Sequence, residues 1–124
     1  MAPTLTLTFM SGSRDGEVVQ LDARGSPPSI SIGRTAPCEL VITDDPDLSR
    51  RHARIFWCGT SWMLEDLNSS NGVFIGEFHA ARRLAGTSAI KDGEIFRAGL
   101  TRLRLGVAGR ENDALARAGA YTER

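Results

Sequence analysis

The chain has 124 residues, 41% of them hydrophobic and 24% charged, which is typical of one globular domain. Fifteen basic and fifteen acidic side chains cancel. We therefore expect no nucleic-acid partner, because general polyanion binders carry an excess of Lys and Arg. No apolar run approaches the roughly 18–20 residues that cross a bilayer, and the opening MAPTLTLTFM lacks the regions of a signal peptide. We expect a cytoplasmic protein with no membrane partner.

The two cysteines, Cys38 and Cys58, are too few and too far apart for a disulfide framework or a zinc site. We expect two buried or half-buried thiols, and we predict neither a metal nor a cofactor. Of the fifteen basic residues only Lys91 is a lysine. Arginine suits bidentate phosphate recognition, although genome composition alone also explains this bias.

Hydrophobic residues recur with period two in short segments, which predicts strands. In the first segment Leu5, Leu7 and Phe9 fall on one face, as in a half-buried strand. The first two segments, the fifth and sixth, and the last two are each expected to form a hairpin. Residues 76–93 show no clear pattern. The predicted strands are Thr4–Met10, Glu17–Leu21, Ser29–Ile32, Leu40–Ile42, Ala53–Cys58, Ser61–Leu67, Val73–Ile75, Glu94–Ala98 and Thr101–Leu105.

Short strands separated by turn signals every 8–12 residues or so indicate an all-β sandwich or barrel. No convincing helix precedes residue 106, and the chain contains no internal repeat. From Gly106 onward large apolar residues become rare. We predict a folded domain over residues 1–105, followed over residues 106–124 by a flexible or weakly helical tail that links to a possible further domain.

Three loops share a polar composition that suits phosphate. Gly33 and Arg34 end one strand, the run LSRRHA (48–53) precedes another, and the run NSSNG (68–72) precedes a third. If a sandwich brings these strand ends together, guanidinium groups, hydroxyls and an amide converge on one rim. Guanidinium and hydroxyl donors bind a phosphate dianion through short charge-assisted hydrogen bonds.

Each element also has an ordinary structural interpretation. A Gly-Arg pair at a strand end is usually a turn with a solvated charge. His52 before a strand is by default a half-buried histidine, and Asn71-Gly72 is first a tight turn with positive φ at glycine. Ser49 and His52 could instead suggest a nucleophile and its base. However, no G-x-S-x-G elbow surrounds Ser49, and no acidic orienting residue is identifiable.

Together, the order and spacing of these motifs resemble the forkhead-associated (FHA) domain. The resemblance rests on Gly33-Arg34, Ser49-x-x-His52 and Asn71-Gly72, within the strings SIGR, LSRRHARI, EDLNSSNGVFI and IKDGEIFRAG. It covers roughly Leu5 to Leu105. It implies an all-β fold of the FHA/SMAD type, a sandwich of two packed, mainly antiparallel sheets whose loops at one end bind phosphothreonine peptides.

The resemblance also implies a role for each matching residue. Arg34, Ser49, Arg50 and Ser70 would bind the phosphate, and Asn71 would hydrogen-bond the peptide backbone just after the phosphothreonine. A small apolar notch near the Asn68–Gly72 loop would take the threonine methyl group. The residues with structural roles would be Gly33 and Gly72, which leave no room for a Cβ, and His52, which would prop the serine loop.

The sequence departs from the family pattern in three places. The family often has a second Asn-Gly after the third motif, where this chain reads Ile75-Gly76-Glu77. The stretch up to Gly86 is longer than expected. Two residues before Ser49, where some relatives carry a basic residue, stands Asp47, which should repel an acidic residue three positions after the phosphothreonine.

The leading hypothesis is a non-catalytic module of a signalling protein that binds a phosphothreonine-containing protein or peptide. A second hypothesis is a sandwich that docks a partner without phosphate, which the presence of Arg34, Ser49 and Asn71 disfavours. A third treats Ser49 and His52 as a hydrolase pair. Oligomeric state is left open.

Overall fold

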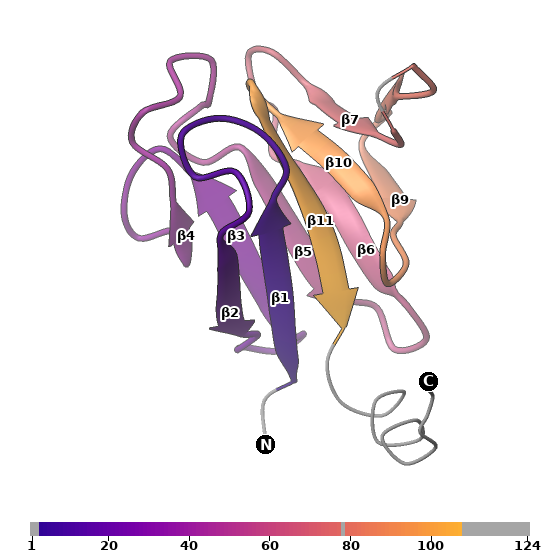
Figure 1. Ribbon diagram of the computed structural model, residues 1–124. Helices are drawn as coiled ribbons and strands as arrows, with labels where there is room; N and C mark the ends of the chain where they lie inside the picture. Colours follow the sequence, from indigo (N-terminus) through magenta and orange to yellow (C-terminus); the bar gives the residue numbers. More distant parts are fainter. Residues whose placement is uncertain (1–2, 78, 108–124) are drawn as a thin grey trace, which may run out of the picture.

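Eleven strands form two sheets in the computed structural model, which describes residues 3–77 and 79–107 (Figure 1). Nine of these strands correspond to the nine that the sequence predicted. The strands are β1 (Thr4–Phe9), β2 (Val18–Asp22), β3 (Ser29–Gly33), β4 (Leu40–Val41), β5 (Ala53–Trp57), β6 (Trp62–Asp66), β7 (Val73–Ile75), β8 (Arg82–Arg83), β9 (Thr87–Ala89), β10 (Ile95–Ala98) and β11 (Thr101–Val107).

The larger sheet has the order β2-β1-β11-β10-β7-β8, and the smaller has the order β4-β3-β5-β6-β9. All neighbouring pairs run antiparallel except β3 and β4, which are parallel. The three predicted hairpins, β1–β2, β5–β6 and β10–β11, are present. The predicted all-β sandwich is therefore confirmed.

The core lies between the two sheets, because one face of the longer strands is apolar. In β1, Leu5, Leu7 and Phe9 are buried while the threonines between them are only half-buried. Ile30 and Ile32 of β3 supply the facing layer from the smaller sheet and are fully buried. Burial of each such side chain contributes about 1.5–3 kcal/mol. The period-two pattern of the sequence therefore predicted correctly which side chains of these strands face the core.

The structure differs from the sequence prediction in a few details. The stretch without a clear pattern contains two very short strands, β8 and β9, at the edges of the two sheets. Strand β11 continues through Gly106 and Val107, two residues beyond the expected end. It extends because Leu5 and Thr6 of β1 pair with these residues. The predicted tail otherwise lies at 108–124, outside the described residues.

One of the two cysteine predictions is also wrong. Cys38 is buried as expected, whereas Cys58 is exposed because it begins the turn between β5 and β6 at the end of the sandwich. Both cysteines are free thiols. Nothing helical that could cross a bilayer occurs within residues 3–77 and 79–107.

Five connections lie at the same end of the sandwich: β1–β2, β3–β4, β4–β5, β6–β7 and β10–β11. Strands β3 and β6 end there, and β5 and β7 begin there, as the antiparallel pairing requires. Figure 1 shows these loops at the top of the molecule, with β4 at the left edge and β7 and β9 at the right. All three polar loops singled out in the sequence are among them.

Candidate functional site

Direct hydrogen bonds join the three polar loops into one rim. The backbone N–H of Arg34 donates to the carbonyl oxygen of Ser49 over 3.0 Å, which ties the β3–β4 loop to the β4–β5 loop. The N–H of Ser70 donates to Oγ of Ser49 over 3.2 Å, and Nδ2 of Asn71 donates to the carbonyl oxygen of Asp47 over 2.9 Å. The structure thus brings together the residues that the sequence selected.

Gly33 is buried where β3 meets the serine loop. A Cβ built on it would lie 2.0 Å from the carbonyl oxygen of Arg50 and 2.8 Å from Sγ of Cys38. The carbonyl oxygen of Arg50 also accepts the N–H of Thr35 over 3.4 Å. Because the obstacle is backbone, no side chain fits at position 33 without moving this loop, as the sequence predicted.

His52 is fully buried and bridges two loops. Its Nδ1 accepts the backbone N–H of Ser49 over 3.0 Å, and its Nε2 lies 2.8 Å from the carbonyl oxygen of Gly72. An N–H can only donate and a carbonyl can only accept, so the hydrogen sits on Nε2. The expected half-buried histidine is thus completely buried, and its Nδ1 holds the backbone of Ser49.

The same geometry contradicts the hydrolase hypothesis. Both ring nitrogens of His52 are engaged with backbone groups, so neither can take a proton from the Ser49 hydroxyl. A nucleophile and its base need a direct hydrogen bond between them or one mediated by water. Ser49 and His52 are structurally coupled through the serine backbone instead.

The Ser49 hydroxyl has one role inside the protein and one left for a ligand. Its oxygen accepts the Ser70 N–H, while no acceptor for its own hydrogen occurs among the described residues. A hydroxyl has one donor and two acceptor positions. Oγ is therefore fixed in place with its O–H available to donate to a phosphate oxygen.

Arg34 and Arg50 are exposed and carry guanidinium groups that pair with no carboxylate in the described part of the chain. Three other arginines do form ion pairs, and these pairs are Arg14–Glu17, Arg24–Asp22 and Arg54–Glu65. The rim that holds Arg34 and Arg50 is therefore locally basic although the whole chain has no net charge.

Some polar side chains of the β6–β7 loop form hydrogen bonds within the protein, and others are exposed to solvent. Ser69 is internal, because its Oγ accepts the N–H of Gly72 over 2.9 Å and its own N–H donates to Asp66. Ser70 and Asn71 are exposed. Gly72 has φ of 85°, the left-handed conformation that the Asn-Gly turn predicted. The side chains of Ser70 and Asn71 are therefore open to solvent, whereas Ser69 is used inside the loop.

Sequence reasoning missed Asp45, which anchors the serine loop to the other sheet. Its buried carboxylate accepts the backbone N–H groups of Leu100 and Asp47 and the hydroxyl of Thr101, over 2.7–3.0 Å. Its position in the acidic run DDPD, just before Ser49, was the only sequence signal. Nothing in that run distinguishes the buried carboxylate from its exposed neighbours Asp44 and Asp47.

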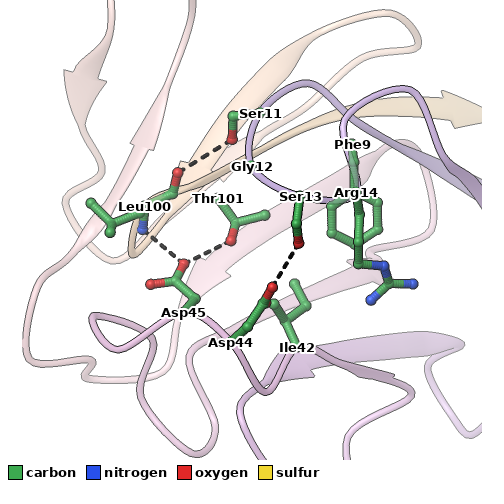
Figure 2. Close-up of a pocket in the computed structure, with 10 residues that line it drawn as sticks. All are labelled: Phe9, Ser11, Gly12, Ser13, Arg14, Ile42, Asp44, Asp45, Leu100 and Thr101. Atoms are coloured by element: carbon green, nitrogen blue, oxygen red, sulfur yellow. Dashed lines mark hydrogen bonds between the residues drawn. The ribbon is translucent and has the colours of Figure 1, made fainter.

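A cavity of about 180 Å³ lies beside this anchor, between the β1–β2 loop, the β4–β5 loop and the β10–β11 turn. Figure 2 shows Asp44 and Asp45 pointing toward Ser13 and Thr101 across it. Two carboxylates in its lining make it a poor place for phosphate, since like charges repel. The unpaired guanidinium groups of the rim therefore suit an anion better than this cavity does.

The FHA domain family model matches residues 30–99, more than half of the chain. The chain therefore belongs to the FHA domain family. FhaB of Mycobacterium tuberculosis is 46% identical to it over 46 residues, 37% of this chain and 29% of FhaB. An FHA domain-containing protein of Arabidopsis thaliana is 32% identical over 75 residues, 60% of this chain and 19% of that protein. The chain thus spans less than a third of these curated relatives.

Solved structures agree with this assignment. An FHA domain studied for phosphothreonine-dependent interactions is 30% identical, with a TM-score of 0.66 and coverage of 86% of this chain and 99% of that one. The FhaA FHA domain, solved with the intracellular domain of Rv3910, is 32% identical, with a TM-score of 0.61 and coverage of 82% and 98%.

Proposed function

We propose that this domain binds a phosphothreonine-containing segment of a partner protein at the rim formed by the β3–β4, β4–β5 and β6–β7 loops, as a non-catalytic module of a signalling protein. The observation that carries the proposal is the state of Ser49. Its Oγ is fixed by Ser70 and its O–H is free to donate, directly beside the backbone of an exposed, unpaired Arg34.

In this proposal each rim residue has one task. The guanidinium of Arg34 grips the phosphate, Arg50 adds positive charge, and the hydroxyls of Ser49 and Ser70 donate to phosphate oxygens. Asn71 fixes the peptide backbone just after the phosphothreonine. Its Nδ2 already donates to the carbonyl oxygen of Asp47, so its Oδ1 remains free to accept an N–H of the peptide.

The solved relatives support this assignment of ligand. One belongs to an analysis of phosphothreonine-dependent FHA interactions, and the FhaA domain was solved with a protein partner. Phosphate-independent docking, the second hypothesis from the sequence, leaves the unpaired guanidinium groups and the free Ser49 hydroxyl without a purpose. The cytoplasmic location expected from the sequence stays a prediction.

The test compares three fluorescein-labelled peptide libraries with random flanks and a central phosphothreonine, phosphoserine or threonine. Wild-type protein should bind the phosphothreonine library and not the threonine library. Arg34→Ala should lose at least tenfold in affinity, since an ion pair stripped of one partner costs about 2–5 kcal/mol. Its melting temperature should stay unchanged because Arg34 is exposed.

Arg104→Ala is the matched control, because Arg104 is also an exposed arginine but lies within β11, away from the rim. Its binding should equal that of the wild type. Equal affinity of the Arg34→Ala variant and the wild type would place the phosphate elsewhere. Binding of the unphosphorylated library would favour docking without phosphate.

A further inference from the structure

Arg83, in the short edge strand β8, contacts the loop that carries Asn71. A Cβ built on Gly72 would lie 2.8, 2.9 and 3.0 Å from Nε, Cζ and Nη2 of Arg83. Three nearly equal distances to atoms of one plane show that the face of the guanidinium is turned toward the position that a Cβ at Gly72 would take. The Arg83 head thus occupies the space that a side chain at position 72 would take, next to Asn71.

No carboxylate within residues 3–77 and 79–107 forms an ion pair with this guanidinium, and Arg83 is exposed. Arg97, two strands away in the same sheet, is different. Its guanidinium lies 4.2 Å above the centroid of the Phe74 ring, and its Nη1 donates to the carbonyl oxygen of Gly99 over 2.7 Å. The N–H groups at the edge of Arg83 are therefore left for a partner that is not part of this domain.

The arrangement of the strands places Arg83 beyond Asn71 as seen from Arg34. Strand β3, which ends just before Arg34, lies toward the left in Figure 1, while β7 lies toward the upper right and β8 pairs with β7. The β6–β7 loop with Asn71 lies between them. A peptide whose phosphate is held at Arg34 and whose backbone is held at Asn71 therefore reaches Arg83 next.

We propose that Arg83 selects an anionic side chain one or two residues after the phosphothreonine. This inference rests on the proposed function, because it uses the peptide direction set by Asn71. An extended chain advances about 3.3–3.6 Å per residue. A guanidinium beside Gly72 is therefore within reach of the first two residues after the one that carries the phosphate.

The chemistry of the group fits a carboxylate or a second phosphate. With one face of its plane against Gly72, the guanidinium presents its N–H edge, which matches two oxygens of an anion side by side. Asp47, exposed on the serine loop, disfavours an acidic residue further along at the third position. Arg83 therefore selects an anionic side chain only at the first or second position after the phosphothreonine.

The experiment selects binders from a phosphothreonine library whose two following positions hold either Ala, Glu or phosphoserine. We expect the wild type to enrich peptides with Glu and with phosphoserine at these positions. Single peptides with Glu there should then bind two to five times more tightly than the same peptides with Ala, as for an exposed ion pair. Arg83→Gln should abolish this gain while binding the Ala peptide as the wild type does. Arg83→Lys should retain part of it.

Arg104→Gln removes the same charge from β11 and should leave the gain intact. Enrichment of Glu alone identifies a carboxylate as the ligand of Arg83, and enrichment of phosphoserine alone identifies a second phosphate. Equal affinity for Glu and Ala peptides, or a gain that survives in Arg83→Gln, would overturn the inference. Failure of every phosphothreonine peptide to bind would instead overturn the proposed function.

Discussion

Nε2 of His52 donates to the carbonyl oxygen of Gly72 over 2.8 Å, so a single buried ring joins the loop of Ser49 to the loop of Asn71. The other ring nitrogen accepts the N–H of Ser49. His52 thus helps to fix the relative position of the two loops from inside the protein, where no ligand can touch it, because it is completely buried.

Replacing His52 by alanine should weaken both the fold and the binding. The substitution leaves the Ser49 N–H and the Gly72 carbonyl without their partner, and an unsatisfied buried polar group costs about 1–3 kcal/mol. We expect the free energy of unfolding in urea to fall by about 2–4 kcal/mol, with a parallel loss of phosphopeptide affinity. His79→Ala, at an exposed histidine, should change neither. Loss of binding at full stability would mean that His52 acts on the ligand directly.

Gly33→Ala should be costly for a different reason. The new Cβ would meet the backbone carbonyl of Arg50 at 2.0 Å, so the serine loop must move. Gly93 is the control, because it has φ of 89° but no atom within 4 Å of a built Cβ. Gly93→Ala should cost about 1–2 kcal/mol from backbone strain alone. Urea denaturation should show a larger loss for Gly33→Ala, together with weakened binding. Equal losses would show that the clash relaxes without cost.

The strands that the sequence predicted are those in which burial and alternation coincide. Leu5, Leu7 and Phe9 alternate with threonines, so the inward face follows from the residues alone. Strands β8 and β9 have no such pattern, because the exposed Arg82 and Arg83 make up all of β8. Their pairing depends on β7 and β6, which the local sequence does not reveal.

At the site, the sequence identified groups whose spacing is fixed by the strands, such as Arg34 after β3 and Ser49 before β5. It gave no signal for Asp45 or for the position of Arg83 beside Gly72, because both depend on residues that are not neighbours in the sequence. Asp45 meets Leu100 and Thr101, more than fifty positions further along the chain, and Arg83 in β8 meets Gly72 just before the neighbouring strand β7. An exposed arginine and one of several aspartates look ordinary until those neighbours are known.

Cys58 should react as a thiolate near neutral pH. Hydrogen bonds from Thr60, and then from Ser61, lower the pKa of this exposed thiol to about 6. Because the thiolate is the nucleophile, iodoacetamide should alkylate Cys58 at a rate that rises through pH 6 and levels off by about pH 7. Thr60→Val should move this midpoint to higher pH. Buried Cys38 is the internal control, read by mass spectrometry, and should stay unmodified. A rate still rising at pH 9 would contradict the lowered pKa.

Phosphothreonine should bind better than phosphoserine in the same peptide. Both carry the same charge and the same acceptor oxygens, so Arg34 and Ser49 cannot distinguish them. They differ by one methyl group, whose burial beside the Asn68–Gly72 loop contributes about 0.8 kcal/mol, a factor of about four. The β-branch also restricts χ1, so less rotamer freedom is lost on binding.

Fluorescence anisotropy with paired peptides at two salt concentrations measures this preference. The ratio of the two affinities should stay constant with salt, because the methyl group is uncharged, while both absolute affinities fall as the phosphate is screened. Arg104→Ala should show the wild-type ratio. Equal affinity for the two peptides would mean that the rim is a clamp for any phosphate, with no notch for the methyl group, and its ligand would then be phosphoserine and phosphothreonine alike.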